Sequence, residues 1–254
     1  ITDSNWGSRQ GRSAQDAAIV KELHYDITHL RLNEYATMEN DAASCYDRMI
    51  PSLIMLVSRS FGINKNTAKS VGMTLQRTRH FIATKNGISR RSFGFREGKP
   101  IFGSWQGATK SVICWVLMCS TLQKIHQEKI KGATFVSIDN KTAITQSTVG
   151  FVDDNNNCVT KEEREPIVKT LQQSAQKWEK LLFASGGSLE FKKCFTYVVK
   201  WTQDEEGKHG ISEESESIEI SDSQTGCTRK INCKKPSEGH KPLGCVKNPN
   251  MNSR

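Results

Sequence analysis

Phe151-Val152-Asp153-Asp154 is the stretch around which the sequence is organised; an apolar run precedes it and three asparagines follow it. Two neighbouring carboxylates repel each other and gain nothing in an apolar core. They become useful where a divalent cation lies between them and a substrate. Such a site needs a third carboxylate from elsewhere in the chain, and Asp41 is the best candidate. We interpret the rest of the sequence as the scaffold that brings Asp41 and Asp153 together.

The charge balance of the chain favours a polyanionic partner. Its 254 residues are enough for one large domain or two small ones with a sizeable core. Lys and Arg total 36 against 27 Asp and Glu, and eleven of these basic residues lie between positions 59 and 110, beside the single acid Glu97. This surplus favours nucleic acid first and an acidic membrane surface second. A solvated face is the alternative for any charge run taken alone.

The cysteines and the hydropathy pattern bear on location. Several of the eight cysteines lie in apolar surroundings, Cys114 and Cys119 among them, which suits free buried thiols in a reducing compartment. No signal peptide is visible and no apolar run approaches twenty residues, so neither secretion nor a membrane span is supported. We expect an intracellular location, in the cytoplasm or the nucleus. Because the chain begins at Ile1, we interpret it as a fragment of a longer protein.

Hydrophobic periodicity predicts helices and strands without a regular strand–helix–strand order, which indicates the α+β class. Residues 84–110 are expected to form a loop, and the acidic segment from 204 an exposed loop that leads to an edge strand. The expected helices cover residues 14–32, 47–61, 65–81, 111–130 and 161–183; the expected strands cover 34–40, 134–138, 143–151 and 189–201, with a hairpin at 218–233.

Three motifs resemble, in order and spacing, the signatures of reverse transcriptases, particularly the retrotransposon enzymes of the non-LTR and related groups. The family has a metal-binding Asp with an aromatic residue five positions on, then a Gln-Gly turn leading into a helix, then an aromatic residue two positions before a pair of aspartates. They are met here by Asp41 and Tyr46, by Gln106-Gly107 with Ser111, and by Phe151 through Asp154.

Three further segments extend the resemblance from about residue 5 to about residue 249. Gly186 to Cys194 resembles the family's glycine, leucine and lysine segment, and residues 240–245 resemble its Leu-Gly turn near the primer end. Residues 7–13 resemble a basic fingers segment. The sequence departs from the family at Val112, where a Pro is usual, and at Trp105 and Lys110. These departures raise the alternative of a decayed copy.

The resemblance implies a polymerase palm, an antiparallel sheet backed by helices, with part of the fingers and without a thumb. Residues 1–40 are then partial fingers leading into the palm. Residues 41–203 are the palm core, which contains the basic segment 59–110. Residues 204–254 form the acidic loop, the hairpin and the end of the palm that resembles a primer grip.

The implied activity is RNA-directed DNA polymerisation, with two Mg²⁺ or Mn²⁺ ions assisting transfer of a nucleotide from a dNTP to a primer 3′-OH. The implied partners are an RNA template, a DNA primer, dNTPs and other domains of a longer polyprotein, with no membrane. The implied metal ligands are the Ala42 carbonyl and the carboxylates of Asp41, Asp153 and Asp154, and these three aspartates are also the implied catalytic residues. The implied substrate contacts are Tyr46, Gln106, Gly107, Arg9 and Lys193. The implied primer contacts are Leu243 and Gly244.

Alternative interpretations stay open for some residues. Tyr46 is compatible with a core aromatic and Asp47 with a structural hydrogen bond, while Asp139 is a rival carboxylate in a sequence typical of a turn. A viral RNA-dependent RNA polymerase is disfavoured by the aromatic at position 46. A nucleic-acid-binding relic without turnover is the second alternative. A zinc module is the third, although the spacing of Cys227, Cys233, His240 and Cys245 does not match a zinc knuckle.

Overall fold

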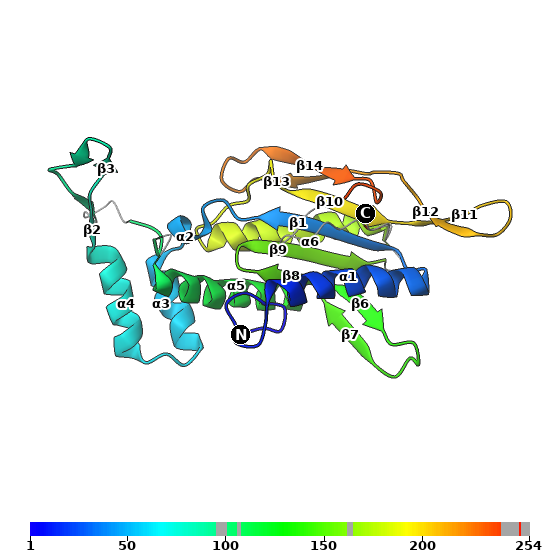
Figure 1. Cartoon of the computed structure of the whole chain (residues 1–254), viewed down its shortest axis with the longest axis horizontal. Coiled ribbons are helices and arrows are strands. Elements are labelled where there is room, and N and C mark those ends of the chain that lie inside the picture. The colour runs from blue at the N-terminus through cyan, green and yellow to red at the C-terminus, as the bar shows by residue number, and fades with distance from the viewer. Residues whose placement is uncertain (95–100, 106–107, 162–164, 240–248, 250–254) are drawn as a thin grey trace.

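A six-stranded sheet forms the centre of the structure, a computed structural model that describes residues 1–94, 101–105, 108–161, 165–239 and 249 (Figure 1). The strand order is β13-β14-β10-β1-β9-β8, so β1 lies inside the sheet between β9 and β10. Neighbouring strands are antiparallel except for β10 and β14. The strands are β1 (Tyr35–Asp41), β8 (Thr148–Phe151), β9 (Asp154–Thr160), β10 (Phe195–Val199), β13 (Ile218–Ser221) and β14 (Thr228–Lys234).

Two long helices, α5 (Thr109–Lys129) and α6 (Ile167–Ala184), cover one face of the sheet. Because side chains alternate along a strand, Ala36 and Met38 of β1 point to this face and enter the main core with both helices. The helix expected over 161–183 is confirmed as α6, although it begins at Ile167, and its apolar stripe is the buried face. Its buried members are Ile167, Leu171, Ala175, Trp178 and Leu182.

The opposite face is partly covered by α1 (Ala14–Arg31) and by the hairpin of β6 (Ala133–Val136) and β7 (Ala143–Gln146). A second core forms there around Tyr35 and Phe135. As expected, α1 begins at Ala14; Ser13 precedes it as the N-cap and forms a capping box with Asp16. α1 also places Lys21 against Glu39 of β1 at 2.8 Å, in an ion pair with little solvent exposure.

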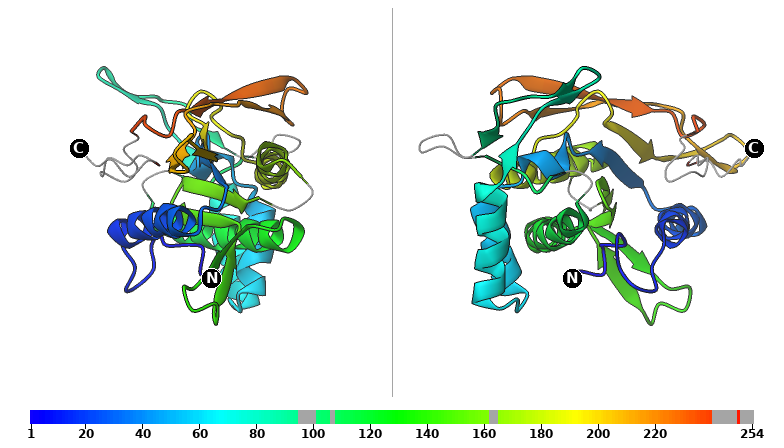
Figure 2. Two further views of the ribbon diagram at one scale, coloured as in Figure 1. Left: turned by 90° about the vertical axis from the view of Figure 1, so that its right-hand side faces the viewer. Right: turned by 60° about the vertical axis from the view of Figure 1, so that its left-hand side comes forward.

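Two projections extend from opposite ends of the molecule (Figures 1 and 2). One is the lobe of helices α2 (Cys45–Arg48), α3 (Pro51–Ser60) and α4 (Lys65–Arg77), with strands β2 (Arg79–His80), β3 (Ala83–Thr84), β4 (Gly87–Ile88) and β5 (Phe93–Gly94). The other is the hairpin of β11 (Trp201–Gln203) and β12 (His209–Ile211). A Cβ on Gly72 of α4 would lie 2.1 Å from the Met55 sulfur, so glycine permits the close contact of α3 and α4.

The α+β class and the 218–233 hairpin are confirmed, while several boundaries differ from expectation. The predicted 47–61 helix is two helices, because Ile50 is extended before Pro51. The predicted 143–151 strand divides into β7 and β8, which pair with different partners. The predicted 84–110 loop contains β4 and β5, and β9 was not predicted. None of the described helices is long and apolar enough to cross a membrane.

Candidate active site

The sheet brings the three carboxylates to one place. Asp41, the last residue of β1, is paired directly with Asp154, the first residue of β9. Residues directly opposite in an antiparallel pair present their side chains on the same face. Asp153 precedes Asp154 in the two-residue turn between β8 and β9. The predicted proximity of Asp41 and the acid pair is therefore confirmed, on the face away from α5 and α6.

The turn that carries Asp153 has a strained backbone held by two neighbours. Val152 has a φ of 57°, a left-handed conformation that is unfavourable for a β-branched residue. The indole nitrogen of Trp115 in α5 donates a hydrogen bond of 2.6 Å to the Val152 carbonyl. From the other side, Gly7 approaches so closely that a Cβ there would lie 2.4 Å from the Val152 nitrogen. The chain's first residues therefore help to fix the acid turn.

The carboxylates act on one another and on their surroundings. Partial burial and then the Asp153 carboxylate raise the pKa of Asp154. Burial raises the pKa of the Cys45 thiol to about 12, with Asp153 as the next cause. Burial, Cys45 and Asp153 together raise the pKa of Tyr46 to about 12. The negative charge of Asp153 is therefore felt at Tyr46, which the sequence analysis placed in the same site.

Lys193 provides a cation within this acidic site. Its Nζ donates a hydrogen bond of 2.9 Å to Asp41, and this bond raises the pKa of Lys193. The lysine side chain is 66% exposed, so the pair can separate at little cost. The segment before it is fastened to β1, because the Glu190 amide donates to the Asp41 carbonyl and Ala42 forms a bridge with Leu189.

Tyr46 and Arg9 lie beside these elements. Tyr46 is in the short helix α2, with its ring 6.3 Å from that of Trp115 at an angle of 61°. Trp115 thus contacts both the acid turn and Tyr46. Arg9 belongs to the same N-terminal loop as Gly7, and its guanidinium donates to the carbonyls of Thr2 and Asn5 at 2.8 and 3.0 Å.

Several predicted residues lie elsewhere or outside the described residues. Gln106, Gly107, Leu243 and Gly244 lie outside them, as do His240 and Cys245 of the zinc alternative. Ser111, expected in the Gln-Gly motif, donates to the carbonyls of Ser104 and Trp105 at the start of α5. Asp139 accepts hydrogen bonds from Ser137 and the Lys141 amide, which confirms the turn interpretation.

A buried polar network beneath the carboxylates was not predicted. Its members alternate with the acids along the strands: Asn40 precedes Asp41, and Asn155 and Asn157 follow Asp154. The Asn157 Oδ1 accepts from Asn40 Nδ2 at 2.7 Å and from Asn155 Nδ2 at 3.2 Å. Three consecutive asparagines show no alternation, so the sequence carries no signal for this network. The amide network, as we call it, comprises Asn40, Asn155, Asn157, Gln123, His126, Ser147 and Ser174, all buried.

Helices α5 and α6 complete the amide network. Gln123 of α5 donates to Asn155 at 3.1 Å, and the ring of His126 lies 3.1 Å from both Asn157 Nδ2 and Ser147 Oγ. Burial lowers the pKa of His126 to about 4, so the ring is neutral near pH 7. The network ties both strands to the helices directly behind the acid site.

The donor set fits a hard divalent cation. Within residues 1–94, 101–105, 108–161, 165–239 and 249, no three His, Cys, Asp or Glu side chains are already arranged as a metal cluster. Asp41 and Asp154 nevertheless share one face beside Asp153, and carboxylate oxygens are the ligands that Mg²⁺ and Mn²⁺ prefer. The pKa of Asp154 is raised by partial burial and then by repulsion from Asp153, and a cation would relieve the repulsion.

Comparison with known proteins bears on the fold. No family model and no curated protein matches the sequence. Telomerase from Candida albicans, solved with a fragment of telomeric RNA, matches with a TM-score of 0.55 and 13% identity over 93% of this chain and 34% of that chain. The Candida tropicalis complex with the same kind of fragment matches with a TM-score of 0.51 and 14% identity over 77% of this chain and 30% of that chain.

A truncated apo telomerase from Candida tropicalis matches with a TM-score of 0.51 and 14% identity, over 96% of this chain and 41% of that one. The fold of this chain resembles that of part of these telomerases. The expected partial palm is therefore confirmed. The chain spans only about a third of the length of these telomerases, and at this identity the likeness concerns the fold alone.

Proposed function

We propose that this chain is an RNA-directed DNA polymerase domain of a retrotransposon, which transfers a nucleotide from a dNTP to a primer 3′-OH. The observation that carries the proposal is the pairing of Asp41 with Asp154 beside Asp153, on a reverse-transcriptase-like palm. The RNA fragments bound by two of the telomerase neighbours support an RNA partner.

The acid site would hold two Mg²⁺ or Mn²⁺ ions on Asp41, Asp153, Asp154 and the Ala42 carbonyl. When bound, such ions favour ionisation of a hydroxyl nucleophile and neutralise the charge of a triphosphate. The chain's own contribution is to bring carboxylates together against their repulsion, with Trp115 and Gly7 fixing the turn. Pre-organisation of this kind reduces the rearrangement needed when substrate binds.

Two further side chains have roles in this proposal. Tyr46 would lie beneath the sugar and exclude a 2′-hydroxyl, which selects deoxynucleotides. Lys193, an exposed ammonium within 2.9 Å of Asp41, would separate from that carboxylate when cations bind and donate a proton to the leaving pyrophosphate. The basic surplus between residues 59 and 110 supports contact with template and primer phosphates. Arg9 would bind the triphosphate only after releasing the Thr2 and Asn5 carbonyls.

The test is primer extension on poly(rA)/oligo(dT) with Mg²⁺ or Mn²⁺. Asp153→Ala should lower dTTP incorporation about 1,000-fold, since it removes several kcal/mol of metal-dependent stabilisation. Asp139→Ala is the matched control, because Asp139 lies in another exposed turn and should be replaceable without loss. Equal activity in both variants would refute the site. Salt-sensitive binding of the hybrid without incorporation would favour the alternative of a binding relic.

A further inference from the structure

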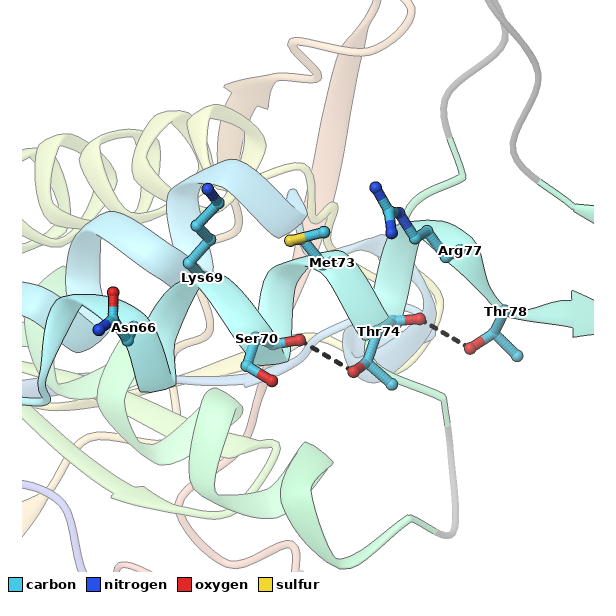
Figure 3. A pocket seen from close by; sticks show the side chains of 7 residues that line it. All are labelled: Asn66, Lys69, Ser70, Met73, Thr74, Arg77 and Thr78. Atoms are coloured by element: carbon cyan, nitrogen blue, oxygen red, sulfur yellow. Dashed lines mark hydrogen bonds between the residues drawn. The ribbon is translucent and has the colours of Figure 1, made fainter.

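The outer face of α4 carries a polar stripe. Its residues recur at intervals of three and four, so they lie on one side of the helix, as Figure 3 shows. The opposite side, with Ala68, Gly72 and Leu75, is buried. The stripe lines a pocket of about 500 Å³. Its members are Asn66, Lys69, Ser70, Met73, Thr74 and Arg77, with Thr78 after the helix.

A second pocket continues from the first toward β2 and β5. The two share Arg77 and Thr78, so together they form one groove that runs from α4 to the β2–β5 pair. The second pocket, of about 380 Å³, is lined in addition by Gln76, Arg79, Ser92, Phe93 and Gly94. We call the combined surface the α4 groove.

The charge around the α4 groove is of one sign. From residue 48 to residue 94 the sequence has nine Lys and Arg and no Asp or Glu. Lys69, Arg77 and Arg79 are exposed, and none forms an ion pair with a residue that the structure describes. Elsewhere in the chain Lys161, for example, pairs with Glu34. The lobe thus holds uncompensated positive charge, which attracts polyanions.

The arrangement of cations fits one phosphate backbone. Lys69 and Arg77 are eight residues apart, about 12 Å along the helix axis, and Arg79 of β2 lines the second pocket beside Arg77. The hydroxyls of Thr74 and Thr78 donate to backbone carbonyls, as Figure 3 shows, so they are occupied within the helix. With no Asp or Glu from residue 48 to residue 94, the groove is suited to holding phosphates more than to reading base edges.

An aromatic ring lies beside these cations. Phe93 is 52% exposed and stacks on His80, with ring centroids 5.2 Å apart and an interplanar angle of 24°. The stacking supports one side of the ring and leaves an apolar surface in contact with solvent. Cations that follow a backbone together with aromatic rings that stack on bases are the usual elements of single-strand binding.

We propose that the α4 groove binds single-stranded nucleic acid, with Lys69, Arg77 and Arg79 on phosphates of one strand and Phe93 beneath a base. A single row of cations on one helix face matches one strand, whereas a duplex presents two backbones. The lobe lies toward the end of β1 that carries Asp41, so a strand held there leads toward the sheet (Figure 1). The inference rests on the proposed function, because it assigns to named residues the strand contact put forward there for positions 59–110, but the binding itself does not depend on chemistry at the carboxylates.

The test measures binding of fluorescein-labelled rU20 by anisotropy over a range of salt concentrations. In Lys69→Gln/Arg77→Gln, affinity should fall about tenfold and the slope of log K against log salt should decrease by about 1.4, as expected for two lost phosphate contacts. Lys129→Gln/Lys180→Gln is the matched control: it removes the same charge from exposed positions of α5 and α6. Phe93→Ala should weaken binding without changing the slope.

Each outcome has a defined meaning. Equal losses in the two double variants would overturn the proposal, because net charge alone would then explain binding. Binding of anionic vesicles without binding of rU20 would overturn it in favour of a membrane surface, which the exposed Phe81, Ile82 and Ile88 would contact. Asp153→Ala should bind rU20 like the unaltered chain, so failure of primer extension and failure of this proposal are distinguishable.

Discussion

The two faces of the β1–β9 pair carry different side chains at adjacent positions, with carboxylates on one face and buried amides on the other. On one face Asp41 and Asp154 lie opposite each other near solvent, where like charges repel. On the other face Asn40 and Asn157 are buried, and Asn40 Nδ2 donates a hydrogen bond of 2.7 Å to Asn157 Oδ1. Because side chains alternate along a strand, the stabilising contacts lie directly behind the destabilising ones. The comparison teaches that β1 and β9 can tolerate clustered carboxylates because their other face is fixed to α5 and α6.

Breaking the buried face should have the largest effect on stability. Asn157→Leu leaves the Asn40 and Asn155 amides without their shared acceptor and removes a partner of His126. Each buried polar group left unpaired costs about 1–3 kcal/mol, so we expect a loss of about 3 kcal/mol in the free energy of unfolding, measured in urea. Gln172→Leu, an exposed amide on α6, should change it by less than about 0.5 kcal/mol. Similar losses in both variants would contradict the comparison.

Acid should weaken the buried face next. Burial lowers the pKa of His126 from 6.5 to about 4. The unfolded chain therefore binds more protons than the folded chain between these values, so stability is full above pH 6.5 and falls toward pH 4. The loss at His126 approaches about 3 kcal/mol. In urea titrations, His126→Gln should be less sensitive to acid than the unaltered chain; an equal pH dependence would refute the assignment.

Removing a charge from the exposed face should change the stability of the fold least, and it should raise stability where the other two changes lower it. The pKa of Asp154 is raised, so its charged form is disfavoured by folding and Asp154→Asn should raise the unfolding temperature slightly at pH 7 while primer extension falls. The gain should disappear below pH 3.8, where the carboxyl is protonated in both states. Asp139→Asn provides the contrast: Ser137 lowers the pKa of that carboxyl, so its loss should not stabilise. Destabilisation by Asp154→Asn would contradict the comparison.

Much of the acid site could be predicted because its chemistry is conspicuous in sequence. A pair of neighbouring aspartates has few structural uses, and the strand predicted over 34–40 ends immediately before Asp41. The buried face could not be predicted in the same way. Asparagine disfavours strands, and only contacts from α5 and α6 make the run from Asn155 to Asn157 a buried strand.

The helices also separate into features that the local sequence predicts and features that only the folded structure shows. The capping box at Ser13 is local, and α1 therefore began where the sequence placed it. The break before Pro51 is also local, and attention to the residue preceding proline would have predicted it. The support of the acid turn by Gly7 and Trp115 joins segments far apart in the chain, so it is visible only in the folded structure.

The two projections of the molecule carry opposite charge. The lobe of α3 and α4 carries no acid between residues 48 and 94, whereas the hairpin and loop at 204–216 hold six carboxylates against one lysine, at the opposite end (Figure 1). The electric field of a polyanion exerts a torque on a chain whose charges are separated in this way. A nucleic acid approaching by diffusion would therefore meet the lobe first, and the orientation of the encounter would be set before any contact forms.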